Sequence, residues 1–244
     1  MAQNILKKVV YEFTTSVSSA TFTASDVNTT TDNVTLANHG YKTGQPVGIL
    51  AGTTIPTGLT EATTGYYIIV VDASTIAFAT SKANAIAGTK VNITGAGAGT
   101  NTLYANGAGI VDLGYLPDNF VLMHSWYDVV TTYVTDDGTT PGNDAGTLAL
   151  STGQGAGDLV AAIAVSDASN VWDAGIQGTL SGTPTLSTFH ASNNPTSLQY
   201  NNGTGGIRAS IIKMTADRIP TLTFATETAT AGSLRLYVEG YQSA

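Results

Sequence analysis

Short stretches in which apolar and polar residues alternate recur along the whole chain. Val9, Tyr11 and Phe13 would lie on one face of an extended strand, and Leu234 and Leu236 would share a face near the C-terminus. No window long enough for a helix carries apolar residues at the three- and four-residue spacing of an amphipathic helix. The pattern therefore predicts an all-β protein.

Turn-rich segments containing Gly, Asn, Asp and Pro separate these stretches, at intervals that are typical of β-sandwiches. One segment, 158–165, fits a strand and a short helix equally well, and segment 81–87 predicts a single helical turn. The fold class that we expect is a jelly-roll-like β-sandwich. The strands that the pattern predicts are 8–14, 33–37, 47–50, 65–71, 76–79, 121–133, 146–150, 206–214, 220–225 and 232–241.

The longest of these strands, 121–133, has apolar residues on both of its faces, so alternation alone leaves its orientation open. We expect both faces to be largely covered, one by the sandwich and the other by a neighbouring molecule or by the small β module that we expect at 20–105. The inward set is either Leu122, His124, Trp126 and Asp128, or Val121, Met123, Ser125, Tyr127 and Val129.

The amino-acid composition excludes several classes of function. Only 11% of the 244 residues are charged, and Lys and Arg number 9 against 17 Asp and Glu, a net charge of −8 that argues against binding to nucleic acid. The chain has no Cys, which excludes disulfides, thiolate metal sites and cysteine nucleophiles. No run of 18 apolar residues predicts a membrane span, and the N-terminus lacks the pattern of a signal peptide.

Two sets of segments resemble structural proteins of tailed bacteriophages. The first resembles a β module that recurs in phage virion and tail proteins: 36–47 (LANHGYKTGQPV), 55–59 (IPTGL), 65–70 (GYYIIV) and 76–81 (IAFATS). The second resembles small phage proteins of one β-sandwich domain: 116–119 (LPDN), 126–132 (WYDVVTT), 158–162 (DLVAA), 212–217 (IKMTAD) and 231–239 (AGSLRLYVE).

The order of these segments predicts an insertion. In the similar sandwich proteins, a strand like the one at 9–13 runs almost directly into a segment like 116–121, whereas about ninety residues intervene here. We therefore expect one sandwich domain made of 1–19 plus 106–244, interrupted by a small β domain at 20–105. Most of the net negative charge lies in 106–244.

The resemblance implies a capsid decoration (cement) protein that binds the outside of an assembled virion shell and stabilises it. The partners implied are the major capsid protein and further copies of the chain, as a homotrimer, with neither nucleic acid nor membrane bound. A tail or fibre-base structural protein is one alternative, because the module also occurs there. A virion carbohydrate-binding module is the other.

The sequence offers no motif that requires catalysis, a cofactor or a metal, so we expect a non-enzymatic protein with none of these. His39, His124 and His190 lack metal-ligand spacing. Segment 95–99 (GAGAG) lacks the context of a dinucleotide loop and is interpreted as a flexible linker. Six acidic residues could supply oxygen ligands but lack EF-hand spacing, and we interpret them as solvated: Asp136, Asp137, Asp144, Asp158, Asp167 and Asp173.

Aromatic residues are the remaining candidates, since they could line a groove for sugars. We expect them to fill the sandwich core and subunit contacts instead. Trp172 is the aromatic most worth testing for sugar binding, because it falls in a loop-rich stretch. The aromatic residues considered are Trp126, Tyr127, Tyr133, Trp172 and Tyr237.

Overall fold

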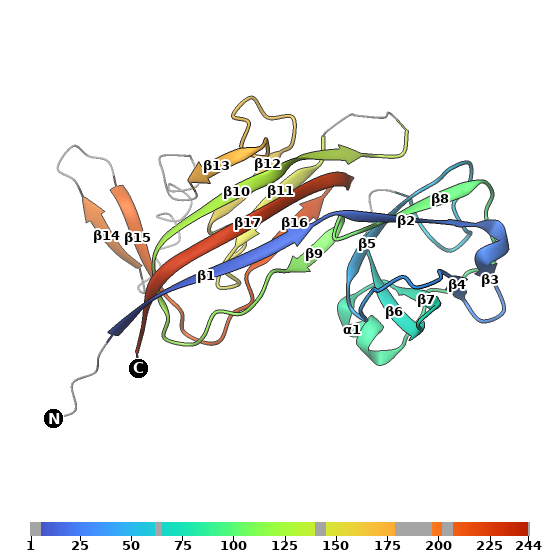
Figure 1. Cartoon of the computed structure of the whole chain (residues 1–244), viewed down its shortest axis with the longest axis horizontal. Helices are drawn as coiled ribbons and strands as arrows, with labels where there is room; N and C mark the ends of the chain where they lie inside the picture. The colour runs from blue at the N-terminus through green and yellow to red at the C-terminus, as the bar shows by residue number, and fades with distance from the viewer. Residues whose placement is uncertain (1–5, 62–64, 140–144, 179–196, 202–206, 244) are drawn as a thin grey trace.

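The computed structural model describes residues 6–61, 65–139, 145–178, 197–201 and 207–243. Almost all regular structure in these residues is β, arranged in three antiparallel sheets (Figure 1). The prediction of an all-β sandwich is confirmed. Segment 158–165, which the sequence left open between strand and helix, contains a strand.

The first sheet carries the two ends of the described chain on neighbouring strands. Its edge strand β1 pairs along its full length with β17, and β17 pairs in turn with the long strand β10. The other edge of β10 pairs with two shorter strands, β13 and β15. In order, this sheet comprises β1 (Leu6–Ser16), β17 (Thr228–Ser243), β10 (Val121–Asp136), β15 (Ile207–Lys213) and β14 (Ser197–Asn201), with β13 (Gly175–Gly178) beside β10.

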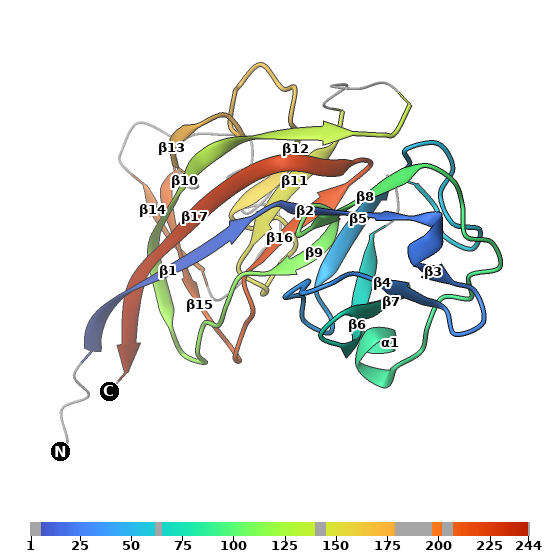
Figure 2. The same cartoon turned by 45° about the vertical axis from the view of Figure 1, so that its right-hand side comes forward.

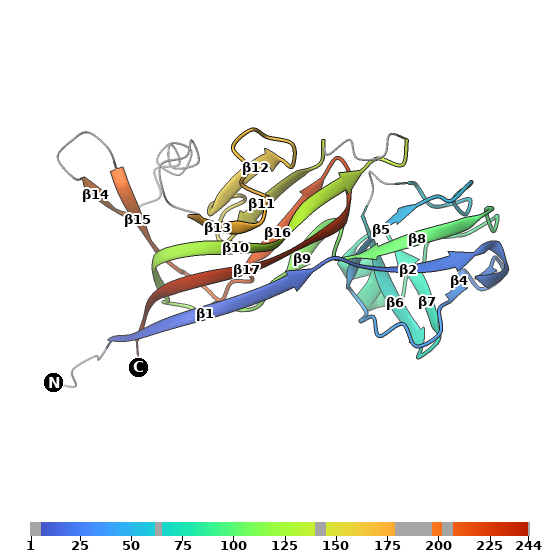
Figure 3. The same cartoon turned by 45° about the horizontal axis from the view of Figure 1, so that its top comes forward.

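The second sheet packs against one face of the first and completes a β-sandwich (Figure 3). It comprises β12 (Val160–Ala164), β11 (Thr147–Ser151), β16 (Thr221–Ala225) and β9 (Gly109–Asp112). Side chains from both sheets form one buried core, in which Tyr133 of the first sheet lies 5.9 Å from Phe224 of the second, measured between ring centroids. The core also includes Phe13, Leu122, Tyr127, Val129, Leu148, Leu150, Trp172, Leu222, Leu234, Leu236 and Val238.

A β-bulge in β10 decides which of its residues face this core. The pairing with β17 shifts between Leu122 and His124, so that Met123 is an extra residue. Leu122 is therefore buried on the same side as Tyr127 and Val129, although strict alternation would place it on the opposite side. Neither of the two predicted inward sets is complete, because the bulge exchanges the faces at residue 123.

The third sheet contains every described strand between residues 18 and 105 and has a core of its own (Figure 2). A 3₁₀ turn, η1 (Ala24–Asp26), and one short helix, α1 (Lys82–Ala87), accompany it. Its core includes Phe22, Val34, Val47, Ile49, Ile68, Ile76, Phe78, Ile93 and Leu103. In order, its strands are β2 (Ser18–Thr23), β8 (Thr100–Ala105), β5 (Pro46–Leu50), β6 (Tyr66–Asp72), β7 (Thr75–Ala79), β4 (Asn33–Thr35) and β3 (Val27–Asn28).

The chain enters and leaves this third sheet at adjacent points. Val17 alone separates β1 from β2, and Ser18 pairs with Ala105 at the far end of the excursion. The side-chain amide of Asn106 then donates to the carbonyl oxygen of Ser16 at 3.2 Å. Residues 18–105, called the inserted unit below, therefore form an excursion from the sandwich. The expectation that the sandwich and the inserted unit are separate domains stays a prediction.

Candidate interaction surface

Histidine and acidic side chains do not gather into a metal site. Within the described parts of the chain, no group of three or more His, Asp or Glu residues is placed to hold a metal ion. His39 holds a turn, where its Nδ1 accepts from the amide of Tyr41 at 3.0 Å and its ring stacks on the ring of Tyr41. His124 is exposed on β10. His190 lies outside the described residues.

The acidic loop after β10 organises its own backbone. Asp136 accepts from the amide of Gly138 at 2.7 Å, and Asp137 accepts from the amide of Thr139 at 2.8 Å. Such contacts two residues apart are typical of Asx turns. Asp144 lies outside the described residues, so the structure does not test its place in the proposed cluster.

Asp158 is the acidic residue with the most distinctive surroundings. Its carboxylate accepts from the amide of Thr152 at 2.6 Å, from the Thr152 hydroxyl at 2.5 Å and from the amide of Gly155 at 3.1 Å. Burial raises the pKa of Asp158, and these hydrogen bonds oppose that shift. Asp158 therefore stabilises the conformation of the loop between β11 and β12. Asp167 similarly binds Ser169, and Asp173 is half-buried without a cluster around it.

The glycine-rich segment 95–99 is not a flexible linker, so that interpretation is wrong. The amide of Thr57 donates to the carbonyl of Gly95 at 2.9 Å, and the amide of Ala98 donates to the carbonyl of Thr54 at 2.8 Å. Gly97 and Gly99 have φ near +75°, which only glycine adopts readily. The glycines therefore let this segment pack closely against residues 54–57.

Most of the candidate aromatic residues belong to the core. Trp172 is fully buried, its indole N–H donates to the carbonyl oxygen of Ile163 at 3.1 Å, and its ring contacts Tyr127 and Tyr133. Burial raises the pKa values of the Tyr127 and Tyr133 phenols far above the usual value for tyrosine. Both phenols therefore stay protonated, as expected for structural residues. Trp172 therefore cannot offer a platform for sugars. The local sequence indicates only that Trp172 lies in a loop. Its burial depends on tertiary contacts, which the local sequence does not reveal.

Trp126 and Tyr237 lie instead on the opposite face of the first sheet, which the second sheet does not cover. They are direct cross-strand partners on β10 and β17, and their rings stack. We call this surface the outer face. Its apolar members also include Val10, Val130, Ile176 and Tyr241, with exposed fractions of 49%, 47%, 77% and 37%.

Charged side chains are interspersed with the apolar ones on the outer face. Arg235 is opposite Asp128, and Glu239 is opposite His124. Lys8 of β1 forms an ion pair with Glu239 at 2.9 Å. The outer face therefore combines exposed apolar side chains with charged ones on a sheet that the second sheet leaves uncovered, and we treat it as the candidate interaction surface.

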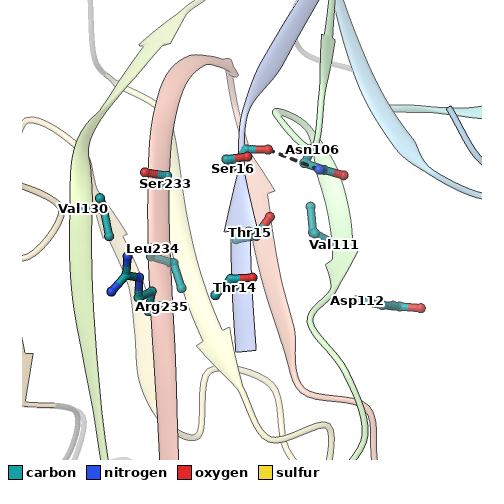
Figure 4. A pocket seen from close by; sticks show the side chains of 10 residues that line it. All are labelled: Thr14, Thr15, Ser16, Asn106, Val111, Asp112, Val130, Ser233, Leu234 and Arg235. Carbon is teal, nitrogen blue, oxygen red and sulfur yellow. Dashed lines mark hydrogen bonds between the residues drawn. The ribbon is translucent and has the colours of Figure 1, made fainter. Parts of the chain in front are cut away.

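Two shallow cavities lie where the sandwich meets the inserted unit. The first, of about 450 Å³, is lined by ten residues that include Thr14, Ser16, Asn106, Ser233 and Arg235 (Figure 4). The second, of about 420 Å³, lies toward the inserted unit, and Lys82 there forms an ion pair with Asp112. Neither lining contains a histidine that could act as a base beside a nucleophile.

Comparison with known proteins gives no assignment: no protein-family model, curated protein or solved structure matches the chain. Among the described residues, no helix has the length and apolar character needed to cross a membrane.

Proposed function

We propose that the chain is a non-enzymatic structural protein of a tailed-phage virion, and specifically a capsid decoration protein on the outside of the shell. Its partners in this proposal are the major capsid protein and further copies of itself. The observation that carries the proposal is the outer face, where Val10, Trp126, Val130 and Ile176 present apolar surface on a sheet backed by a packed core. A rigid surface loses little conformational entropy on binding.

The resemblance of the sequence to phage proteins also supports this proposal. The segments that resemble phage proteins cover both the sandwich and the inserted unit, which fits a virion component of two β units. A protein that binds the assembled shell and not free subunits stabilises the assembled state by mass action. No enzymatic step is needed for this effect. The homotrimer expected from the resemblance stays a prediction.

The number of copies per virion tests the location. Purified virions would be separated on a denaturing gel, and the band of this chain compared with that of the major capsid protein by densitometry. A decoration protein should be present in hundreds of copies. A few to tens of copies would instead assign the chain to the tail or fibre base, the alternative that the module at 20–105 suggests.

The stabilising role has its own measurement. Particles lacking the chain should assemble but release DNA at a lower temperature, or with greater sensitivity to ionic strength, than complete particles. A DNA-release melt of both kinds of particle checks this. Equal melting curves together with lost adsorption to host cells would contradict a cement role and favour tail or glycan binding.

A carbohydrate-binding role rests only on the half-buried pair Trp126 and Tyr237 on the outer face. Sugars stack on the face of an aromatic ring, whereas these two rings stack on each other. Binding of the purified chain to a glycan array would nevertheless count in favour of that alternative, and its absence would count against it.

A further inference from the structure

Strand β1 has one edge without a partner. All 11 of its residues pair with β17, and among the described residues no strand pairs with its other edge. In an antiparallel ladder, every second residue directs its backbone N–H and C=O away from the neighbouring strand. β1 therefore presents a long row of free donors and acceptors along the sheet margin (Figures 1 and 3). It contains neither proline nor a bulge to block pairing.

Charged residues on β1 restrict what can pair there. Its outer-face positions are Lys8, Val10, Glu12 and Thr14, because Tyr11 and Phe13 lie opposite the buried Val238 and Leu236. Lysine at a sheet edge discourages pairing with an arbitrary strand. The favoured partner of β1 is therefore a strand that places a carboxylate opposite Lys8.

A second copy of β1 satisfies this requirement in one register. Two identical antiparallel edge strands are related by a two-fold axis perpendicular to the sheet, and facing residues then lie on the same side of the sheet. Such an axis must pass beside one residue of β1. An axis at Lys8 or Glu12 places identical charges opposite each other, whereas an axis at Val10 places Lys8 of each copy opposite Glu12 of the other.

We propose that β1 pairs with β1 of a second copy about a two-fold axis at Val10. The first sheets of both copies then join into one continuous sheet, and their outer faces form one surface. Val10, which is 49% exposed in the single chain, packs against Val10 of the second copy. Lys8 then lies between Glu239 of its own chain and Glu12 of the second copy. This pairing gives a dimer in place of the expected trimer.

Cysteine cross-linking tests the register directly, because the natural chain has no Cys. In Val10→Cys the two new thiols face each other across the axis, so mild oxidation should convert most of the protein into a covalent dimer. Thr14→Cys is the matched control, since Thr14 is exposed on the same face. Its two thiols would be eight residue positions apart along the strand, about 27 Å. Cross-linking of both variants alike, or of neither, would overturn the proposal.

A charge exchange tests the ion pairs in the absence of any cross-link. Light scattering of the unmodified protein should give twice the chain mass of 25.0 kDa. Glu12→Lys and Lys8→Glu each place like charges opposite each other and should lower the dimer fraction at least tenfold at low salt. The double variant Lys8→Glu/Glu12→Lys restores opposite charges and should recover the dimer. A mass of one or three chains for the unmodified protein, or a double variant as monomeric as the single ones, would refute the β1 pairing.

Circular dichroism and thermal unfolding of each variant show whether the fold is retained. Both charged side chains are exposed, and ion pairs between exposed side chains contribute little to stability. The variants should therefore unfold close to the temperature of the natural chain once differences in association are allowed for. The dimer does not depend on the virion role, so failure of either proposal leaves the other standing.

Discussion

The indole ring of Trp126 lies almost parallel to the phenol ring of Tyr237, with ring centroids 5.3 Å apart and an angle of 13° between the ring planes. The two residues are direct partners across β10 and β17, and neither belongs to the sandwich core. Stacked aromatic pairs contribute about 0.5–1.5 kcal/mol beyond the area that they bury. The pair therefore holds a fixed, partly exposed aromatic surface in the middle of the outer face.

Trp126→Ala should weaken binding to the virion shell at least tenfold while leaving the sandwich folded. Tryptophan at the centre of an interface often contributes 2 kcal/mol or more to the free energy of binding. Trp126 should matter less for folding, because it is only half-buried in the free chain. Binding would be measured by co-sedimentation of the purified chain with shells that lack it. The free energy of unfolding should fall by only about 1 kcal/mol, the size of the lost aromatic contact.

Two control variants separate this effect from general damage. His124→Ala changes an exposed residue on the same face and should alter stability and binding by no more than about 0.5 kcal/mol. Trp172→Ala removes a fully buried ring and should cost about 3–5 kcal/mol of stability. Unchanged shell binding by Trp126→Ala would exclude the outer face as the contact surface.

The strands could be predicted from the sequence because alternation is a local property. The predicted segments 8–14, 65–71 and 121–133 overlap β1, β6 and β10, and the helical turn predicted at 81–87 overlaps α1. Each of these assignments rests on neighbouring residues only. The same local reasoning missed the short strands β8 and β9, which are only six and four residues long and carry few large apolar side chains.

The orientation and neighbours of the strands could not be predicted in the same way. The bulge at Met123 moves Leu122 into the core, and nothing in the sequence near 123 distinguishes a bulge from regular alternation. The exposed edge of β1 depends on the order β1–β17–β10, which joins residues that are at least about ninety positions apart. The outer face has the same origin, since it becomes visible only when the pairing of Trp126 with Tyr237 is known.

Gly48→Ala should destabilise the contact between the inserted unit and the sandwich. A Cβ atom at Gly48 would lie 2.2 Å from the hydroxyl oxygen of Thr228, which is fully buried. Overpacking of this kind typically costs about 1–3 kcal/mol. Chemical denaturation would measure the loss. Thr228→Ala in the Gly48→Ala background should cost less than it does alone, because it relieves part of the overlap.

Gly155→Ala is the matched control for this glycine. A Cβ atom there would meet its nearest neighbour, the Cβ of Asp158, at 3.5 Å, an ordinary van der Waals contact. We expect a change within about 0.5 kcal/mol. Equal losses for the two glycine variants would show that close packing at Gly48 is not what matters.

Asp158 should make the free energy of unfolding fall as pH rises above the usual pKa of an aspartic acid. Burial raises its pKa in the folded state above the usual value of 3.8 for an aspartic acid, so the folded protein binds its proton more tightly than the unfolded chain does. Stability from this group is fully present below the unfolded pKa and is lost as pH rises to the folded pKa. Asp158→Asn removes this dependence, so the difference between natural and variant curves should decline with pH across that window.

Asp167→Asn provides a control of opposite sign. Asp167 is exposed, and its hydrogen bonds with Ser169 lower its pKa. Its contribution is therefore present above the unfolded pKa and lost as pH falls through the folded one. Urea denaturation at several pH values would record both differences. Slopes of the same sign for Asp158→Asn and Asp167→Asn would contradict the assigned role of burial.

Removal of residues 20–105 should leave a folded sandwich. The two ends of the cut are already close, because Ser18 pairs with Ala105 and Asn106 donates to the carbonyl of Ser16, so a short Gly/Ser linker can join them. The sandwich core contains no side chain from the removed segment. The deletion does expose surface on β17, where Thr228 contacts Gly48, so some stability should be lost.

Circular dichroism and urea unfolding of the deletion variant test this expectation. A β spectrum with one cooperative transition is expected, since the two packed sheets of the sandwich remain. The denaturant slope should be smaller than that of the full chain in proportion to the surface removed. A control that lacks residues 6–16 instead should unfold, because β1 supplies Phe13 to the core and covers the edge of β17. Random-coil dichroism for the 20–105 deletion would show that the sandwich depends on the inserted unit for folding.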